Sequence, residues 1–326
     1  MAPIIVPNKQ ALLTGATGNL GPHVLDLLLK ENFQVRVATP DRPLIQHRSI
    51  EWIQADFMEE QTWTRLVADC DIVVHLAAEL WNQAKMKRVN IAATAALAEA
   101  AEQSGVKVFC YTSSVGVYGF PPTHVITEAT PTMRTDAEGD REYLAPKFLF
   151  EYARTKLLGE FEMLRCLRKT MGVIVRPTNI VNEINIKDVL EWGFWRRIWR
   201  GHRWTHQIYV KDVAAAIVFL CRRALSMGSG AADKVEIFNI SNDDEATNRY
   251  FHVFRRSYEY TGKPFFGCPF WVPSFFDIWK DRVKFRRLSI GLPAGCVQYS
   301  PKKLLSTGFF YPHNIRRVQD RVLREI

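Results

Sequence analysis

The stretch Thr14-Gly15-Ala16-Thr17-Gly18-Asn19-Leu20-Gly21 lies between two segments of opposite character. Residues 10–14, which lead into it, read as a strand, and residues 20–30 have the apolar spacing of a helix. Glycines at such a junction allow a tight turn, close approach of the backbone to a pyrophosphate and tight packing of the helix on the strand. The helix N-terminus offers N–H groups and a positive dipole end to phosphates. The stretch therefore predicts a dinucleotide-binding loop, to which we assign Gly15, Thr17, Gly18, Asn19, Leu20 and Gly21.

The alternation of strand and helix patterns continues to residue 180. Further strands are predicted at 34–38, 50–54, 71–76, 106–111 and 172–175, and long helices at 84–104 and 147–170. This alternation is typical of a doubly wound parallel α/β sheet, the Rossmann fold. We expect residues 1–180 to form the dinucleotide-binding domain and residues 181–326 to form mainly a smaller, interleaved substrate lobe. Segments near 205–223 and 235–240 are expected to return to the first domain.

Composition excludes several other classes of protein. The chain has 326 residues, of which 47% are hydrophobic, and this content excludes a mainly disordered chain. No apolar run approaches the ~18 residues of a membrane-spanning helix, and the N-terminus lacks a signal-peptide pattern, so we predict a cytoplasmic protein. The six cysteines have no metal-like spacing, and we expect no metal site and structural roles for His75, His202 and His206.

The net charge of +9 is unevenly distributed along the chain. Residues 1–180 have a net charge of −1, whereas residues 181–326 have a net charge of +10. A basic total alone would suggest nucleic-acid binding. Its confinement to the predicted substrate lobe instead favours an anionic group on a small-molecule substrate, and we expect no nucleic-acid partner.

The residue at the end of the second predicted strand bears on the choice of cofactor. A carboxylate there would bind the adenosine ribose and indicate NAD, but the position holds Thr39. Arg42, three residues later, is suited to a 2′-phosphate. The sequence therefore favours NADP and leaves NAD as the alternative. Asp56 ends the third strand, where it is suited to accept a hydrogen bond from the adenine amino group.

Three polar residues predict the catalytic chemistry. Tyr152 and Lys156 are four residues apart, so they lie on one face of a helix. A nearby ammonium group lowers the pKa of a phenol from ~10, which lets tyrosine act as a general acid/base near neutral pH. Ser114 follows the fifth predicted strand, and ligands gather at the carboxyl ends of such strands. We expect Ser114 to hydrogen-bond the substrate oxygen on which Tyr152 acts.

Together these motifs resemble the extended short-chain dehydrogenases/reductases. That family includes nucleotide-sugar epimerases and dehydratases, 3β-hydroxysteroid dehydrogenases and dihydroflavonol-type reductases. The resemblance covers nearly the whole chain. Its motifs are the glycine loop, Asp56, His75-Leu-Ala-Ala78, Asn90, Ser114, Tyr152 with Lys156, Arg176-Pro177 and Tyr209-Val-Lys-Asp212-Val213.

The resemblance implies a role for each matching residue. Tyr152 would be the acid/base, Lys156 would bind the nicotinamide ribose, and Ser114 would polarise the carbonyl, with help from Thr112 or Ser113. It also implies a homodimer formed by the two long helices. The cofactor-binding residues expected beyond the glycine loop are Thr39, Arg42, Asp56, Phe57, Leu76, Ala77, Ala78, Asn90, Thr112, Tyr152, Lys156, Pro177 and Asn179.

The chain departs from the nucleotide-sugar enzymes at positions that bear on its substrate. Val115-Gly116 replaces the Asp-Glu pair of the dehydratases, which makes elimination of water an unsuitable reaction, and the Gly-Asp-Gly loop before Tyr209 is missing. Residues 192–204 are instead rich in tryptophan and arginine. On a helix, Trp192, Trp195 and Trp199 would share a face. The substrate residues we predict are Ser114, Val115, Asn179, Trp195 and Trp199.

The sequence thus leads to one main hypothesis and two alternatives. The main hypothesis is an NAD(P)-dependent oxidoreductase that interconverts a secondary alcohol and a ketone on a ring-containing substrate. The first alternative is a sugar or nucleotide-sugar epimerase with tightly bound NAD, which Asn179 favours. The second is a non-catalytic protein that senses dinucleotides. Aromatic clusters in residues 192–204 and 265–279 also leave peripheral membrane contact open.

Overall fold

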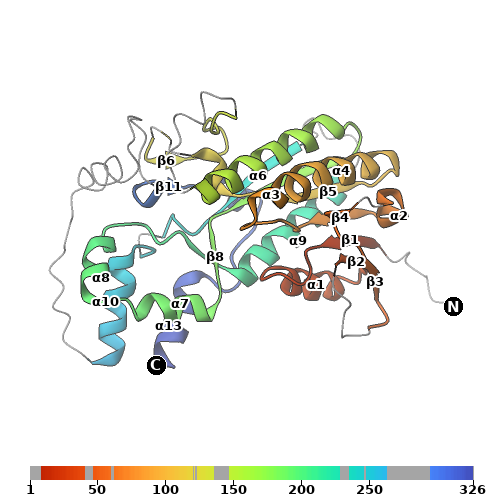
Figure 1. Ribbon diagram of the computed structural model, residues 1–326. Coiled ribbons are helices and arrows are strands. Elements are labelled where there is room, and N and C mark those ends of the chain that lie inside the picture. Colours follow the sequence, from red (N-terminus) through yellow and green to blue (C-terminus); the bar gives the residue numbers. More distant parts are fainter. Residues whose placement is uncertain are drawn as a thin grey trace, which may run out of the picture. The chain divides into compact units, whose positions relative to one another are not determined.

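The computed structural model describes residues 9–40, 47–59, 62–119, 121, 123–135, 147–227, 235–245, 247–262 and 294–325 (Figure 1). The chain divides into two compact units. Unit 1 comprises Met1–Ser113, Thr155–Val175 and Ala214–Ile237, and unit 2 comprises Ser114–Arg154, Arg176–Val213 and Phe238–Ile326. The domain boundary near residue 180 that the sequence suggests stays a prediction.

A seven-stranded sheet forms the centre of the fold. Its strands run in the order β10-β7-β5-β4-β1-β2-β3. Their bounds are β1 Gln10–Thr14, β2 Gln34–Thr39, β3 Ile50–Gln54, β4 Ile72–His75, β5 Val108–Thr112, β7 Met171–Pro177 and β10 Val235–Ile240. The pairs from β3 to β7 are parallel, with Leu13 of β1 opposite Val37 of β2 and Val74 of β4. The predicted doubly wound α/β fold is thereby confirmed.

The strand order reverses at β1, which has β2 on one side and β4 on the other. The chain first moves outward from β1 to β3 and then returns to add β4, β5 and β7 on the opposite side. In open parallel sheets of this kind, ligands bind beyond the carboxyl ends of the strands at the reversal point. Thr14 ends β1 and His75 ends β4, so the reversal lies where the glycine loop begins.

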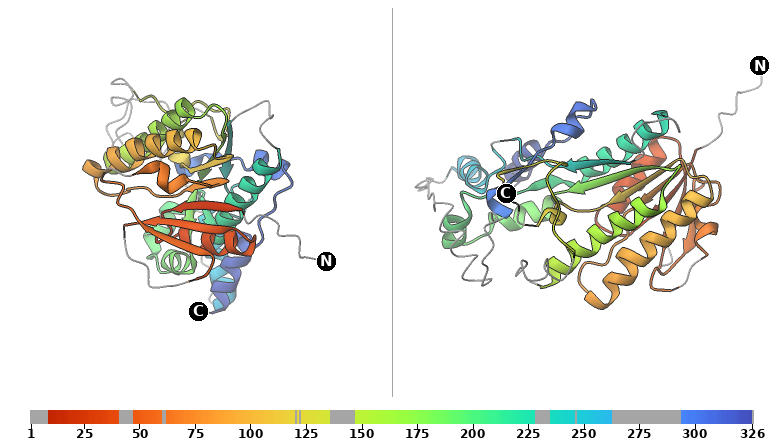
Figure 2. Two further views of the ribbon diagram at one scale, coloured as in Figure 1. Left: turned by 90° about the vertical axis from the view of Figure 1, so that its right-hand side faces the viewer. Right: turned by 90° about the horizontal axis from the view of Figure 1, so that it is seen from above.

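Helices cover both faces of the sheet because apolar side chains occupy one stripe of each helix. Figures 1 and 2 show α4 (Ala93–Gln103) and α6 (Lys147–Cys166) on one face, and α1 (Gly21–Lys30) and α9 (Val210–Met227) on the other. Leu97 of α4 and Met163 of α6 join Phe109 of β5 in a buried apolar cluster. Burying such side chains stabilises the fold by about 1.5–3 kcal/mol each.

The helix predicted at 84–104 differs from the structure in one respect. The segment is divided into α3 (Gln83–Met86), a π-helical turn η1 (Lys87–Ala92) and α4. Asn90 lies within the π-helical turn and is completely buried. Its side chain accepts a hydrogen bond from the backbone N–H of Glu79 at 2.8 Å and donates one to the Glu79 carbonyl at 2.9 Å. The turn thus directs a polar side chain inward, which the apolar periodicity of the sequence does not reveal.

Unit 2 consists of shorter elements. Short parallel strand pairs form between β8 and β9 and between β6 and β11. Its elements are η2 Val115–Tyr118, β6 Val125–Ile126, β8 Asn179–Val181, α7 Glu183–Leu190, α8 Phe194–Arg200, β9 Gln207–Tyr209, α10 Tyr250–Thr261, η3 Ala294–Cys296, β11 Gln298–Tyr299, α12 Lys302–Ser306 and α13 Ile315–Arg324; α2, Trp63–Val67, belongs to unit 1. None of the helices that the structure describes is long and apolar enough to cross a membrane.

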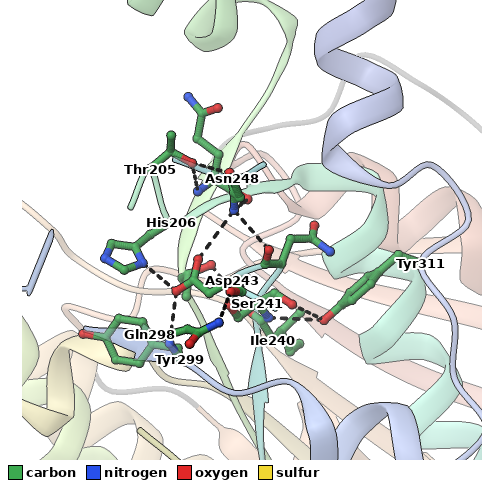
Figure 3. Close-up of polar contacts among 12 residues, drawn as sticks. Thr205, His206, Ile240, Ser241, Asp243, Asn248, Gln298, Tyr299 and Tyr311 are labelled. Carbon is green, nitrogen blue, oxygen red and sulfur yellow. Dashed lines mark hydrogen bonds and ion pairs between the residues drawn. The ribbon is translucent and has the colours of Figure 1, made fainter. Parts of the chain in front are cut away.

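A buried polar network holds separate segments of unit 2 together (Figure 3). The buried carboxylate of Asp243 accepts hydrogen bonds from His206 Nδ1 at 2.6 Å and from the backbone N–H of Tyr299 at 3.1 Å. Tyr311 donates its hydroxyl proton to the carbonyl of Ser241 at 2.7 Å. Buried polar groups require such partners. The network joins the start of β9 to the segment after β10 and to β11.

Helix α8 does not include Trp192, the first residue of the tryptophan stripe predicted for residues 192–199. The helix begins only at Phe194, because Gly193 adopts an extended conformation at the N-cap. Trp192 therefore precedes the helix and packs against Tyr250, with ring centroids 5.0 Å apart. Trp195 is 72% exposed and contacts Phe194 edge to face. These two tryptophans have different surroundings, so the prediction was wrong for Trp192. A shared face for Trp195 and Trp199, which are four residues apart on α8, stays a prediction because the Trp199 side chain lies outside the described residues.

Candidate active site

The glycine loop joins β1 to α1 in unit 1. Gly15 has φ +71°, a left-handed conformation that side chains rarely adopt. Its carbonyl accepts a hydrogen bond from the backbone N–H of Gly18 at 3.2 Å, which closes the turn. Helix α1 begins at Gly21 with no side-chain cap and no acidic residue in its first turn. The first N–H groups of α1 are therefore suited to bind an anion such as a pyrophosphate.

Gly21 is required by close packing within this loop. A Cβ atom at Gly21 would lie 2.3 Å from the Gly15 carbonyl oxygen and 2.5 Å from the Ala16 carbonyl carbon, whereas one at Gly18 would lie 3.4 Å from its nearest neighbour. Gly21→Ala should therefore destabilise the protein by about 2 kcal/mol or more, because backbone must move. Gly18→Ala is the matched control and should change stability by less than about 1 kcal/mol, because Gly18 is exposed and has room for a methyl group. Urea unfolding of both variants tests this, and equal losses would contradict it.

A hydrogen-bonded chain beneath the loop fixes the end of β4. Thr14 Oγ1 lies 2.7 Å from His75 Nδ1, and His75 Nε2 lies 3.0 Å from Thr94 Oγ1. Thr14 Oγ1 also accepts from the backbone N–H of Ala77, and Thr94 donates to the Asn90 carbonyl. One arrangement of protons satisfies all four contacts, with a neutral His75 protonated on Nε2. Burial is the main cause that lowers the pKa of His75 to about 3, which agrees with this neutral form.

The predicted cofactor residues that follow β4 are held in place by Asn90, which also belongs to unit 1. Asn90 clamps the backbone of Glu79 and donates to Thr155 Oγ1 at 3.0 Å, so it fixes the segment that follows β4. Leu76, Ala77 and Ala78 belong to that segment and are partly buried. Asn90 therefore connects the segment after β4 to helix α6.

Three buried polar atoms near the end of β5 and on α6 have no hydrogen-bond partner among the described residues. They are Thr112 Oγ1, Ser113 Oγ and Lys156 Nζ. Buried polar groups in proteins are almost always paired, so these three groups are suited to hydrogen-bond a polar ligand. Together with the backbone N–H groups at the start of α1, these donors fit a dinucleotide, which carries phosphates, ribose hydroxyls and an amide.

Tyr152 and Lys156 occupy one face of α6, one turn apart, as predicted. Burial raises the pKa of Tyr152 to about 12. Burial also lowers the pKa of Lys156 to about 7, and Glu160 opposes this shift through its charge. The sequence predicted a lowered phenol pKa. In this structure desolvation dominates instead, so Tyr152 is a protonated phenol at neutral pH.

Ser114 and Val115 open the 3-10 turn η2 in unit 2. Ser114 is extended at the N-cap of the turn, and its Oγ accepts a hydrogen bond from the backbone N–H of Gly116 at 3.1 Å. Its hydroxyl proton is thus available to donate to a ligand. Gly116 lets Ala153 of α6 approach closely, since a Cβ at Gly116 would lie 3.2 Å from the Ala153 methyl group. The structure thereby places η2 against the turn of α6 that carries Tyr152.

Sequence reasoning assigned no role to several residues that support this region. Tyr118 donates to Asn239 Oδ1 at 2.8 Å, and the Arg176 guanidinium lies 4.8 Å from the Tyr118 ring centroid. Tyr111 is completely buried against Lys156, with Lys156 Nζ 4.0 Å from the ring centroid. The available signal was a polar aromatic residue within a buried strand or turn, which needs a partner for its hydroxyl group.

The remaining predicted residues have varied surroundings, and their ligand contacts stay predictions. Thr39 is buried at the end of β2, and Phe57 packs on Trp63. Asp56 accepts from the backbone N–H of Met58. Asn179 is exposed, while Pro177 is buried. Arg42 and the side chain of Trp199 lie outside the described residues.

Comparison with known sequences identifies the family. Residues 11–241 match the profile of the NAD-dependent epimerase/dehydratase family. Among curated relatives, protein y4nG of Sinorhizobium fredii is 27% identical over 179 residues, which cover 53% of this chain but 41% of the relative. The decarboxylating sterol-4-alpha-carboxylate 3-dehydrogenase of Dictyostelium discoideum is 26% identical over 271 residues, 76% of this chain and 75% of that enzyme. UDP-glucose 4-epimerase of Bacillus subtilis is 27% identical over 156 residues, covering 42% and 46%.

Comparison with solved structures supports the fold. The Bordetella bronchiseptica enzyme WbmH, solved in complex with NAD+, aligns with a TM-score of 0.65 at 18% identity. The alignment covers 97% of this chain and 96% of that protein. A likeness at this level of identity is evidence for the fold alone. With the profile match over most of the chain, the motifs and the fold agree: this chain belongs to the NAD-dependent epimerase/dehydratase family of enzymes, as its sequence motifs predicted.

Proposed function

We propose that this protein is an NAD(P)-dependent oxidoreductase that interconverts a secondary alcohol and a ketone on a ring-containing substrate. The observation that carries the proposal is the pair Tyr152 and Lys156 on one face of α6, in which the Lys156 ammonium group is buried without a hydrogen-bond acceptor among the described residues. Such a group needs a polar ligand, and the ribose hydroxyls of a nicotinamide dinucleotide would supply one. WbmH was solved with NAD+ bound, which supports this class of cofactor.

The chain's own residues divide the work of this reaction. When bound, the dinucleotide donates or accepts the hydride. The backbone of the glycine loop would hold its pyrophosphate, and Lys156 with Thr112 would hold its nicotinamide half. Ser114 would donate a hydrogen bond to the substrate oxygen, and Tyr152 would give that oxygen a proton during reduction or remove it during oxidation. Because burial raises the pKa of Tyr152 to about 12, the phenol holds at neutral pH the proton that reduction requires.

The epimerase alternative differs in what happens to the cofactor. An epimerase returns its hydride to the substrate, so it retains its cofactor and shows no net redox change. The similarity to UDP-glucose 4-epimerase keeps this reaction open. We nevertheless propose the oxidoreductase first, because this chain lacks the Gly-Asp-Gly loop of the sugar-nucleotide enzymes.

One experiment separates these functions. The purified protein is denatured to identify any retained dinucleotide, and the native protein is then assayed with cyclic ketones and with nucleotide sugars. Net oxidation of the reduced nicotinamide by a ketone supports the oxidoreductase. Retained NAD with epimerised product and no net oxidation would establish the alternative. Binding of dinucleotide without turnover of either class would favour the non-catalytic sensor.

The choice between NADP and NAD depends on the end of β2. We propose NADP, since the buried Thr39 offers no carboxylate to the adenosine ribose. Thr39→Asp should raise the KM for NADPH at least tenfold, because a carboxylate repels the 2′-phosphate, and it should change the KM for NADH much less. Thr39→Asn is the matched uncharged control. Steady-state kinetics with both cofactors test this, and an unchanged KM ratio for Thr39→Asp would contradict the preference for NADP.

A homodimer is proposed as well. Phe161 and Leu164 of α6 are 44% and 38% exposed, so this helix presents apolar side chains that a second copy of the chain would bury. Light scattering of the native protein measures its mass directly. A monomer at micromolar concentration would refute this part of the proposal.

A further inference from the structure

The Lys156 side chain lies in an environment that is unusual for an ammonium group. It is 1% exposed, and Nζ has no hydrogen-bond acceptor among the residues that the structure describes. The contact that the structure does provide is the aromatic ring of Tyr111, whose centroid is 4.0 Å from Nζ. A desolvated cation over an aromatic face is stabilised by the quadrupole of the ring, and a neutral amine is not.

Tyr111 is held firmly in this position. It ends the buried run of β5, and its ring stacks on the His75 ring with centroids 5.6 Å apart and planes 28° apart. His75 is itself fixed by Thr14 and Thr94. The Tyr111 hydroxyl group donates to the Lys156 carbonyl at 3.4 Å, so the same residue contacts both the side chain and the backbone of Lys156.

Gly159 makes this contact between strand and helix possible. A Cβ atom at Gly159 would lie 2.3 Å from the Tyr111 hydroxyl oxygen and 2.6 Å from the Asn90 carbonyl oxygen. Any side chain there would push α6 away from β5. The glycine one turn beyond Lys156 therefore brings the helix close enough for the Tyr111 ring to contact the ammonium group.

We propose that Tyr111 is a positioning residue for Lys156, whose ring holds the ammonium group in its charged form and whose hydroxyl group fixes the backbone of α6 at Lys156. The inference deepens the proposed function, since a charged Lys156 is what that reaction requires. The contact itself exists without cofactor or substrate.

The charged groups around Lys156 support this role for the ring. His75 on β4 is neutral, because its pKa is lowered to about 3 by burial and by the charge of Lys156. Glu160 on α6 favours the charged amine, while burial opposes it and lowers its pKa to about 7. On β5 the neighbouring group is the uncharged Tyr111 ring, and on α6 Tyr152 is an uncharged phenol at neutral pH. Stabilisation of the cation therefore depends on Glu160 and on the ring.

A double-mutant cycle at two pH values tests the proposal in the cofactor-free protein. Unfolding is measured for the wild type, Tyr111→Leu, Lys156→Met and the double variant at pH 6 and pH 9.5. At pH 6, where Lys156 is charged, Tyr111→Leu should lower the folding equilibrium constant about tenfold more in the wild-type background than in the Lys156→Met background. At pH 9.5, where the folded state holds a neutral amine, the extra factor should approach one. A purely structural role predicts the same factor at both pH values and would overturn the proposal.

Three comparisons isolate the ring from its hydroxyl group and from packing in general. Tyr111→Phe keeps the ring, so its coupling to Lys156→Met should be the same at pH 6 and pH 9.5. Phe109→Leu, two residues earlier on β5, removes a buried ring that contacts His75 and should couple to Lys156→Met equally at both pH values. If Tyr111→Leu does not fold, phenylalanines of increasing fluorination at position 111 weaken the quadrupole with little change in shape. Their effect at pH 6 should follow the number of fluorines, and an effect independent of fluorination would contradict a role for the ring.

A kinetic measurement links the contact to the proposed reaction. The pH profile for dinucleotide dissociation should shift toward lower pH by about one unit in Tyr111→Leu and remain in place in Tyr111→Phe. If Lys156→Met keeps full turnover, the proposed function is wrong, but the pH-dependent coupling in the cofactor-free protein still stands. If turnover is lost while the coupling is independent of pH, the inference about Tyr111 is wrong and the proposed function stands.

Discussion

Tyr152→Phe is expected to lower kcat by about 10²- to 10⁴-fold with a substrate that the wild type reduces, which is the range lost with a general acid. The variant removes one hydroxyl group and keeps the ring, so packing in this part of α6 changes little. Dinucleotide affinity should change less than about threefold, because Lys156, the glycine loop and the other expected cofactor-binding residues remain in place and only one hydroxyl group is lost. Loss of kcat with an unchanged dissociation constant is the signature of a group that acts in the transition state.

The control for this variant is a tyrosine far from the chemistry. Tyr260 on α10 is 40% exposed. Its described ring contact is with the Arg324 guanidinium. Tyr260→Phe should leave kcat and KM unchanged. A Tyr152→Phe variant that turned over as fast as Tyr260→Phe would show that another group supplies the proton, and Ser114 would be the next candidate.

Lys156→Met is expected to change activity and stability in opposite directions. Turnover should fall by at least 10²-fold, since the group that binds the nicotinamide half and holds the charge near Tyr152 is gone. The cofactor-free protein should nevertheless become more stable at neutral pH. Burial lowers the pKa of Lys156 from 10.5 to about 7, so folding at neutral pH opposes protonation of a group that is charged in the unfolded chain. This difference of roughly 3.5 pKa units corresponds to a destabilisation on the order of 4–5 kcal/mol, which the methionine removes.

The pH dependence of stability gives this prediction its sign. Between pH 7 and pH 10.5 the unfolded state binds the Lys156 proton and the folded state does not, so wild-type stability should rise with pH across this window. Below pH 7 both states bind the proton, and this contribution becomes constant. Lys156→Met should flatten the rise, whereas the exposed Lys169, changed to Met as a matched control, should leave it in place. Chemical denaturation at pH 7 and pH 10 measures both, and parallel curves for the wild type and Lys156→Met would contradict the prediction.

The sequence was sufficient for the fold class because its signals are local. The strands β1, β2 and β3 and the helix α1 lie where apolar runs and helical spacing predicted them. A strand that is buried on both faces, such as β4 or β7, is an apolar run whatever its neighbours are. The glycine loop was equally readable, because a turn that needs a positive φ at Gly15 and close packing at Gly21 permits few other residues.

Contacts between distant segments were not readable in the same way. Asn90 points inward because a π-helical turn interrupts the helix. Its partner Glu79 precedes it by 11 residues, and its partner Thr155 lies on α6, 65 residues further along the chain. The ionisation of Tyr152 and Lys156 also followed burial more than their spacing. The sequence predicted a lowered phenol pKa from the pair alone, and desolvation in the folded protein gave the opposite direction.

By itself, then, the sequence determined the parallel sheet, the dinucleotide loop and the pairing of Tyr152 with Lys156. Each of these depends on residues that are close together in the chain, within one or two helical turns or within one strand and the loop after it. The tertiary structure alone decided which partners those residues meet. It placed Tyr111 under the Lys156 ammonium group, stacked Tyr111 on His75 and required glycine at position 159. The physical reason is that a buried charge responds to every group packed around it, and those groups come together only when β4, β5 and α6 are assembled.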